Sequence, residues 1–566
     1  MMQMMFRAGL MFSLWCCLVP VRAETDASVQ DADASCTPFN GMREKIADAG
    51  DTRIKTTLFR GLEGKRIRQI GFKTISVFDP EDPRDSHQLY LWLNKLHINT
   101  RPSVIRAQLL FEEGGSLKIE EIEESERILR SRSYLTNAYI VPVTVCDDQV
   151  DLLVVTQDAW ALEPQFSVSR ESEDTKTGFA ISDGNILGTG NSLTISYAES
   201  DKRNLVGYNL TNPHIFNSQI STRLYYADTT DGRNSMVKIE KPFHALATPW
   251  AAGMHVEELA LTNDIRYRDE QINEYQHFSR FNQVYAGLAS DVNSHYTQRW
   301  LVGFSQEEDE FAATAETTMG IPQDRNATYS WVEYQYLDNR FGVFKNVNQI
   351  QRAEDISLGK TLSLRLGYGP SDWDNPGEVV RYIASYTQMI DIQDLHLFEL
   401  GFSVNGRQYA ELDDVSSQVL SSTISYNYFH DEKNRWYFSV NYSQGNKLAQ
   451  FEELTVGDIT GLRGYPTDFQ RGNRRYVFTA ERRYFSDLHL FSLLRVGAVA
   501  FFDMGKAWGL PEYGESQLLS NVGIGLRLSS SRVKIGTVAR LDIATPLVQR
   551  NGISEYQVTI GGATKF

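Results

Sequence analysis

The residue pattern with the clearest chemical meaning is an arginine that lies between two glycines. Gly461, Leu462, Arg463, Gly464 and Tyr465 form a turn between two segments that alternate like β-strands. A guanidinium held away from bulk water needs a carboxylate partner, and two parallel hydrogen bonds make the strongest pairing. Taken alone, the same residues also fit an ordinary surface turn with an exposed arginine.

Two acidic residues on the segments that follow are candidate partners for this arginine. In RRYVFTAERRYF the alternation puts Phe478 on the apolar face and Glu481 on the other face. In LLRVGAVAFFDMGKAW it puts Phe502 on the apolar face and Asp503 on the other. Both acids are therefore predicted to lie on the non-apolar faces of their strands, where Arg463 could meet them.

The sequence carries no motif for catalysis or for a metal. It has no Gly-x-Ser-x-Gly elbow, no His-Glu-x-x-His helix and no Walker loop. Its ten histidines are scattered, and the GTGN turn at residues 188–191 is not followed by a helix that could cradle a phosphate. We therefore expect a protein that is not an enzyme and that has no metal site and no cofactor.

Charge and the first residues narrow the possible partners and location. The 566 residues carry a formal net charge of -16, which disfavours nucleic acid as a partner. Residues 1–23 combine Arg7, an apolar run and a small residue, Ala23, as a cleaved signal peptide does. The alternative, a membrane-anchoring helix, is weaker because the run is too short to span a bilayer.

Four cysteines are present, and two of them lie in the predicted signal peptide. Cys36 and Cys146 remain in a chain expected to enter an oxidising compartment, where a cysteine pair is more often a disulfide than a metal site. The sequence leaves two readings open, a bond between Cys36 and Cys146 or two separate thiols.

From about residue 165 onward the chain repeatedly alternates apolar or aromatic residues with small or polar ones. The clearest segments are TLSLRLGYG, RWYFSVNYS and SNVGIGLRLSS. Two architectures fit such strands: a soluble sandwich with an apolar core, and a membrane barrel with an apolar exterior and a polar lumen.

Three features favour the barrel over the sandwich. The segments are roughly nine to eleven residues long, as a tilted membrane-crossing strand requires. Short turns such as Asn212-Pro213 alternate with long acidic loops such as residues 306–326. The chain also ends in an amphipathic strand, whose apolar face is predicted to carry Tyr556, Val558, Ile560 and the terminal Phe566.

These features predict a transmembrane β-barrel over residues 161–566. Allowing about 25 residues for a strand and its connection, and an even strand number, the barrel would have about 16 antiparallel strands.

A more charged region, with a composition that favours helices, precedes the predicted barrel. Residues 24–64 read as a polar amino-terminal segment, and residues 65–160 as a small α/β domain outside the membrane. The expected order is a strand at 65–77, helices at 86–96 and 118–132, and strands at 138–145 and 149–156.

The stretch FEEGGSLKIEEIEESERILRSRSYLTNAYIVPV, followed by VDLLVVTQDAW, resembles a polypeptide-transport-associated (POTRA) domain. With the barrel that follows, the chain resembles the BamA/TamA superfamily of outer-membrane proteins, of the bacterial surface antigen type. The resemblance implies that the loop carrying Arg463 folds back into the lumen, where the arginine faces Asp503 of the Phe-x-Asp-x-Gly motif. The lumen side of the alternation adds Glu481 as a second acid.

The resemblance implies a protein of the outer membrane of a Gram-negative bacterium, with the POTRA-like domain in the periplasm. It would insert or translocate polypeptides through that domain and a weak lateral seam. Its expected partners are outer-membrane lipid and lipopolysaccharide, an unfolded or nascent polypeptide client, and a periplasmic or lipoprotein accessory.

The alternative reading is a passive channel or structural surface antigen that retains the fold only, because a single POTRA-like domain is fewer than the central assembly protein has. Secretion of one dedicated partner chain is less well supported, because it usually goes with two such domains and a plug helix.

Overall fold

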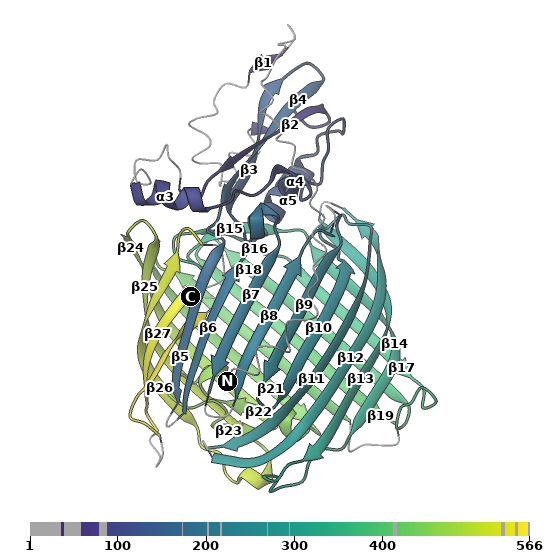
Figure 1. Cartoon of the computed structure of the whole chain (residues 1–566), viewed down its shortest axis with the longest axis vertical. Helices are drawn as coiled ribbons and strands as arrows, with labels where there is room; N and C mark the ends of the chain where they lie inside the picture. The colour runs from purple at the N-terminus through teal and green to yellow at the C-terminus, as the bar shows by residue number, and fades with distance from the viewer. Residues whose placement is uncertain are drawn as a thin grey trace, which may run out of the picture.

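The structure is a computed structural model of the whole chain, and it describes residues 36–38, 58–78, 88–171, 174–200, 203–215, 218–268, 270–293, 295–410, 416–533, 538–548 and 553–563. These residues form a large barrel with a smaller domain at one open end (Figure 1). The predicted signal peptide, residues 1–23, and the terminal Phe566 lie outside the described residues.

Twenty strands of the described chain close into one antiparallel barrel. Neighbouring strands follow the order of the chain, and the last strand returns to the first. The strands are β5 (Leu162–Glu171), β6 (Asp174–Asp183), β7 (Ser192–Glu199), β8 (Asn204–Asn212), β9 (Ser221–Thr229), β10 (Gly232–Lys241), β11 (Trp250–Tyr267), β12 (Glu270–Val292), β13 (Tyr296–Ala313), β14 (Arg325–Asp338), β17 (Lys360–Gly369), β18 (Val379–Ile392), β19 (His396–Tyr409), β20 (Ser417–Phe429), β21 (Asn434–Asn446), β24 (Arg474–Leu490), β25 (Leu494–Trp508), β26 (Leu519–Ser530), β27 (Val538–Pro546) and β28 (Gln557–Ala563).

The prediction of about 16 strands is therefore wrong. It allowed too many residues for each strand and connection, because the first hairpins of the barrel are short. The six strands from β5 to β10 have 8 to 10 residues each. Their tightest turns leave two residues between the paired strand ends Glu171 and Asp174, and between Thr229 and Gly232.

About half of the predicted acidic loop at residues 306–326 is also strand. Residues 306–313 continue β13 and pair with β12, and residues 306–309 also pair with residues 325–328 of β14, so that only residues 314–324 connect the two strands. The hydrophilic side chains there indicate a loop when the sequence is read alone. A barrel strand also carries such side chains, because one of its faces meets water in the lumen or beyond the membrane.

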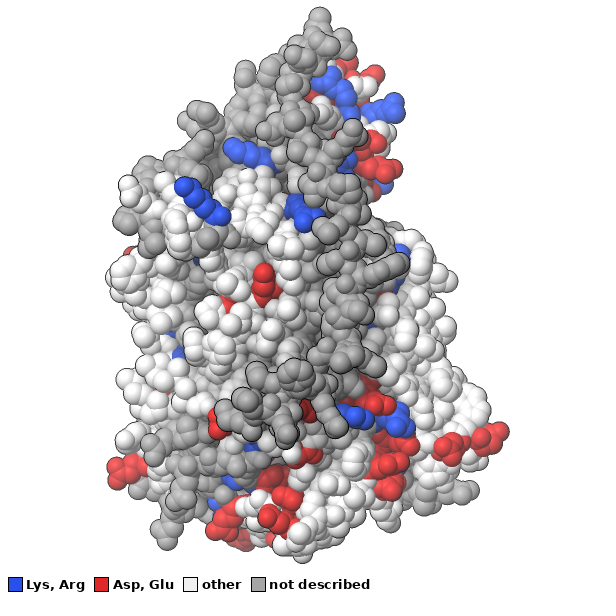
Figure 2. All heavy atoms as spheres, in the orientation of Figure 1, with Lys and Arg blue, Asp and Glu red and all other residues white. Residues whose placement is uncertain are grey.

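The alternation of the sequence is the alternation of the barrel wall. On β26, Val522, Ile524 and Leu526 are exposed on the outside, whereas Asn521 and Arg527 are buried inside. Figure 2 shows few charged side chains over the middle of the visible wall, and acidic side chains gather at the end away from the smaller domain. An apolar outer face on a closed barrel is the pattern of a transmembrane β-barrel.

No helix within the described ranges is long and apolar enough to cross a membrane.

The amino-terminal domain pairs helices with a four-stranded sheet of order β1-β3-β4-β2. Its strands are β1 (Thr37–Pro38), β2 (Arg66–Ile75), β3 (Leu135–Val145) and β4 (Gln149–Asp158), and its helices are α3 (Gln88–Leu96), α4 (Pro102–Arg106) and α5 (Ile119–Ser131). A POTRA-like domain is not evident, because β1 and α4 lie outside the predicted order of one strand, two helices and two strands.

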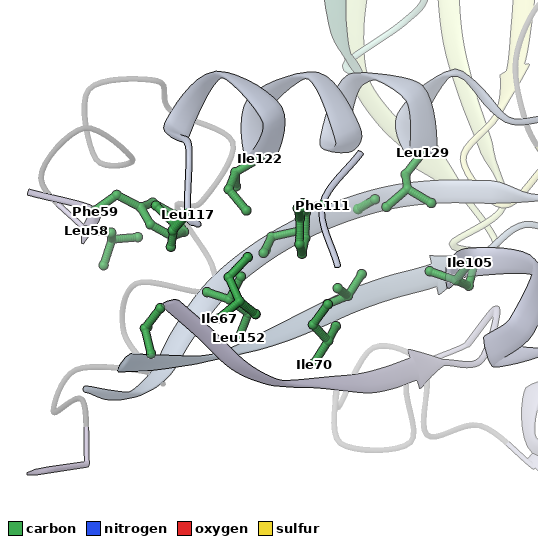
Figure 3. Close-up of a cluster of buried hydrophobic side chains, with 14 of the residues drawn as sticks. Leu58, Phe59, Ile67, Ile70, Ile105, Phe111, Leu117, Ile122, Leu129 and Leu152 are labelled. Carbon is green, nitrogen blue, oxygen red and sulfur yellow. The ribbon is translucent and has the colours of Figure 1, made fainter. Parts of the chain in front are cut away.

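The core of this domain lies between α5 and the sheet. Ile122 and Leu129 point from α5 toward Ile67 and Leu152 of the strands (Figure 3). The helix was predicted from the apolar spacing of these positions, and burying each such side chain contributes about 1.5–3 kcal/mol. Leu58, from the stretch expected to be a polar segment, also lies in this core.

Cys36 and Cys146 form a disulfide, so the structure brings together the two cysteines whose pairing the sequence leaves open. The bond joins residues 110 positions apart and lies beside β1, which pairs with residues 144 and 145 of β3. Cross-linking so long a loop restricts the unfolded chain, which contributes about 3–5 kcal/mol to the stability of a folded domain.

Polar contacts fix the amino-terminal domain on the mouth of the barrel. Arg130 of α5 makes two hydrogen bonds of 2.7 and 2.8 Å to Asp355. Asp355 belongs to β16 (Ala353–Ser357), which pairs with β15 (Phe341–Lys345) in a hairpin between β14 and β17. Glu124 of α5 accepts a hydrogen bond of 2.7 Å from the Leu246 backbone N–H between β10 and β11.

Candidate functional site

The longest connection of the barrel folds into its lumen. It comprises residues 447–473 between β21 and β24, and contains the short 3-10 helices η4 (Gln450–Glu452) and η5 (Asp458–Thr460) and the strands β22 (Leu454–Val456) and β23 (Gln470–Gly472). We call residues 447–473 the lumen loop. Its middle is buried, because Val456, Leu462 and Tyr465 are fully enclosed by the surrounding wall and loop.

Apolar side chains hold the tip of the lumen loop against three barrel strands. Leu462 and Tyr465 pack in one buried cluster with wall residues of β24, β25 and β26, namely Val477, Ala507 and Leu519. The Tyr465 hydroxyl donates a hydrogen bond of 2.9 Å to the Ser520 carbonyl. This packing fixes the loop on the part of the wall that carries the predicted acids.

Arg463 is the centre of the site. Its Nε and Nη2 donate to the two carboxylate oxygens of Asp503 at 2.9 and 2.7 Å, and its Nη1 lies 2.8 Å from Oε1 of Glu481. The guanidinium also stacks over the Phe501 ring, 3.5 Å from its centroid. One arginine therefore holds acids on two adjacent strands, β24 and β25, against the loop.

The neighbouring side chains complete the pairing of this ion cluster. Asn521 donates a hydrogen bond of 2.8 Å to Asp503, and Arg483 donates one of 2.7 Å to Glu481. Asp503 is 0% exposed and Arg463 is 8% exposed. A charge so enclosed is stable only while its counter-charges and hydrogen bonds remain, so the cluster ties the loop tip to the wall.

The glycines on either side of the arginine are required by the backbone. Gly461 has a φ of 106°, a conformation that glycine adopts without the strain of a side chain. A Cβ on Gly464 would lie 2.6 Å from the Asn521 Cβ and 3.3 Å from the Pro546 backbone nitrogen. The motif thus combines one left-handed turn with one close backbone approach.

A second ion-pair cluster, which the sequence interpretation missed, holds the start of the lumen loop. Arg325 of β14 lies 2.7 Å from Glu452 of the loop and 2.9 Å from Asp309 of β13. His277 of β12 lies 3.0 Å from the same Asp309 carboxylate. Assigning residues 306–326 to a loop hid this cluster, and strand alternation through Glu307 and Asp309 would have shown two inward acids.

The barrel closes weakly at one seam. Among the described residues, strand β28 pairs with β5 through three residue pairs, Val558 with Arg170, Thr559 with Ser169, and Ile560 with Val168. Over the described residues, every other pair of neighbouring barrel strands shares seven or more residue pairs, and β11 with β12 shares 18. We call the β28–β5 junction the seam.

The predicted carboxyl-terminal strand residues are placed differently from one another. Val558 and Ile560 lie on the outward face of β28, with Ile560 exposed, while Gln557 and Thr559 are buried toward the lumen. Tyr556 is exposed but precedes the strand, and Phe566 lies outside the described residues.

The fold and the site define a transmembrane β-barrel whose lumen holds a long loop latched to the wall by a buried arginine. Similar solved structures include BamA from Haemophilus ducreyi lacking POTRA domains 1–3, with 13% identity, a TM-score of 0.39, and coverage of 88% of this chain and 84% of that chain. CdiB from Escherichia coli has 13% identity, a TM-score of 0.46, and coverage of 89% and 77%.

CdiB from Acinetobacter baumannii is similar at 10% identity, with a TM-score of 0.44 and coverage of 89% of this chain and 74% of that chain. At these values the likeness carries no argument about activity. No protein-family model and no curated protein sequence matches this chain.

Proposed function

We propose that this chain is an outer-membrane protein of the assembly and translocation type, which inserts or translocates polypeptides through a laterally opening barrel. The observation that carries the proposal is the seam, where the described residues form three pairs, in a barrel whose other described strand junctions have seven or more. A non-enzymatic role agrees with the ion cluster around Arg463, whose groups are all mutually paired.

The short ladder makes the seam the easiest place to open. Each backbone hydrogen bond contributes about 0.5–1.5 kcal/mol net in water, so few such contributions oppose separation at the seam. Inside a membrane an uncovered strand edge is very unfavourable, because its N–H and C=O groups have no water to bond. A client polypeptide that enters as a strand satisfies these groups, which makes a polypeptide the natural occupant of an open seam.

The amino-terminal domain offers a strand edge where a client could first bind. The start of β2 is covered, because Ile67 exchanges backbone hydrogen bonds with Gly114 and Gly115. Residues 71–75 of β2 have a ladder partner on one side only, β4, within the described residues. Strand addition to such an edge binds an extended chain through its backbone, with little dependence on sequence.

The passive-channel alternative agrees less well with the contents of the lumen. The lumen loop is tied to the wall at its start by Glu452 and at its tip by Arg463, and Arg471 near its end pairs with Glu453 at 2.8 Å. An open pore needs a water-filled passage, and here ion pairs and apolar contacts bind the loop to the wall.

Depletion of the protein in its host tests the proposal. We expect the amounts of other folded outer-membrane barrels, or of one dedicated client, to fall severalfold, because clients would accumulate unfolded in the periplasm. The measurement is quantitative proteomics of the outer-membrane fraction, with re-expression of the unmodified chain as the control. A normal outer-membrane proteome after depletion, together with a large conductance of the purified protein, would instead support the passive channel.

A further inference from the structure

The helix α3 has one face with two apolar side chains, Leu91 and Trp92, that the described part of the protein leaves uncovered. Gln88, Leu91, Trp92 and Lys95 follow a spacing of three and four residues, so they share one side of the helix. All four are exposed, and Trp92 is 55% exposed. A tryptophan beside a leucine on an open helix face is costly to leave in water.

The other side of α3 is fixed beside the end of the barrel. Tyr90 stacks on Phe78 with ring centroids 4.6 Å apart, and its hydroxyl bonds to the Phe491 carbonyl. Asn94 donates a hydrogen bond of 2.7 Å to the Phe78 carbonyl. Arg532, between β26 and β27, lies over the Phe78 ring and bonds to the Val77 carbonyl at 3.1 Å.

The hairpin that α3 contacts is itself apolar and exposed. Leu488 and Leu490 at the end of β24 and Phe491 in the turn before β25 all face outward, and Phe491 is 80% exposed. Tyr484, earlier in β24, is also exposed and belongs to the outer wall. The hairpin beside α3 therefore carries exposed apolar side chains that continue the apolar wall of the barrel.

The orientation of α3 fits a helix that lies parallel to a membrane surface at the end of the barrel. In Figure 1 the helix lies across the long axis of the barrel, just beyond the end of β24, and reaches out to one side. A helix that lies in the plane of a membrane interface buries apolar side chains at the boundary of the headgroups, with tryptophan at that level and basic residues toward the phosphates.

We propose that α3 and the β24–β25 turn form a membrane-surface anchor, with Leu91, Trp92 and Phe491 in the phospholipid interface and Lys95 near the phosphates. We call this set the rim anchor. The occupant is a lipid surface rather than a protein, because α3 lies at the end of the lipid-facing wall, beside a hairpin whose exposed apolar side chains continue that wall. The inference rests on the function proposed above, that of an outer-membrane barrel. It adds that the amino-terminal domain also touches the bilayer.

Depth-dependent quenching tests the rim anchor in the full chain. An environment-sensitive fluorophore is attached at Trp92→Cys in protein reconstituted into vesicles of phosphatidylethanolamine and phosphatidylglycerol that contain nitroxide-labelled lipid. Gln88→Cys, on the same helix face, repeats the measurement with Leu91 and Trp92 retained. Cys36 and Cys146 are bonded to each other, and protein without an added cysteine reports background labelling.

Two control positions separate this proposal from the membrane placement of the barrel. Ile524→Cys is on the outer wall and is 64% exposed. Glu112→Cys is exposed on the domain near the start of β2, at the end that carries the disulfide. We expect quenching at residues 88 and 92 to exceed that at residue 112 by about threefold or more, as interfacial burial of the helix requires.

Quenching at residue 524 but not at residues 88 and 92 would overturn the rim anchor while leaving the barrel in the membrane. No quenching at residue 524 would overturn the membrane placement itself. Aqueous iodide distinguishes the remaining cases: strong iodide quenching at residue 92 would show a solvated helix, and protection from both quenchers would show a protein cover. Both results contradict the proposal.

Discussion

Replacement of Arg463 by alanine is expected to destabilise the folded barrel by about 3–5 kcal/mol, which is enough to deplete it in cells. The substitution leaves Asp503 and Glu481 buried side by side, both negatively charged and without the guanidinium that lies 2.7 to 2.9 Å from their oxygens. It also frees the tip of the lumen loop. The measurement is the fraction of heat-modifiable barrel and its urea unfolding midpoint.

A double-mutant cycle in which uncharged side chains replace both charged ones assigns this effect to the ion pair. Asp503→Asn is expected to be destabilising alone, and the double variant Arg463→Ala/Asp503→Asn less so than the sum of the two, by about 0.5–3 kcal/mol. A charge exchange between the positions would be a poorer test, because Glu481 would then face a second acid at residue 463.

Arg280→Ala is the matched control, since Arg280 pairs with Glu258 and Glu308 at exposed positions, where ion pairs contribute about 0–1 kcal/mol. If Arg463→Ala and Arg280→Ala unfold at the same urea concentration, the latch contributes nothing to the fold. The tip of the lumen loop would then be held by its apolar contacts and by the hydrogen bond of Tyr465.

A disulfide across the seam is expected to stop client insertion, with at least about a tenfold loss in the amount of folded client, because the open edge needed for strand addition cannot form. Thr559→Cys and Ser169→Cys place the two thiols on directly opposed residues of β28 and β5. The readout is the amount of newly folded client in the outer membrane under oxidising and then reducing conditions.

The same cross-link within a long ladder is the control for the seam. Ser421 and Ser443 oppose each other on β20 and β21, and their hydroxyls lie 3.0 Å apart. Ser421→Cys with Ser443→Cys is expected to leave insertion unchanged, and reductant treatment of the unmodified chain reports any effect of opening Cys36–Cys146. Equal activity of the seam-locked and control-locked proteins would contradict lateral opening.

The face that each strand residue occupies could be predicted from the sequence, because alternation is a local property of extended chain. Val522 and Ile524 on the outside, and Asp503 and Glu481 on the inside, lie where the pattern places them. The meeting of Arg463 with these acids came from the resemblance, since no local rule tells whether a long connection enters the lumen or leaves the barrel.

What could not be predicted depends on contacts between distant segments. The number of strands depends on how many short hairpins the closed barrel contains. Dividing the chain length by an average length per strand does not give that number. The pairing of Arg325 with Glu452 depends on where the lumen loop enters. The seam, which only the resemblance implied, depends on the register of β28 against β5. The rim anchor was missed because a helix at 86–96 reads as a core helix until its neighbours are known.

The most direct test of lateral opening is photo-cross-linking of a client during its assembly. A photoreactive amino acid is placed at Ile560, on the exposed outer side of β28 at the seam, and at Leu366, on the exposed outer side of β17. The proposed function predicts adducts with an unfolded barrel client at residue 560 and none at residue 366. Adducts of equal yield at both positions, or at neither while the client still assembles, would contradict it.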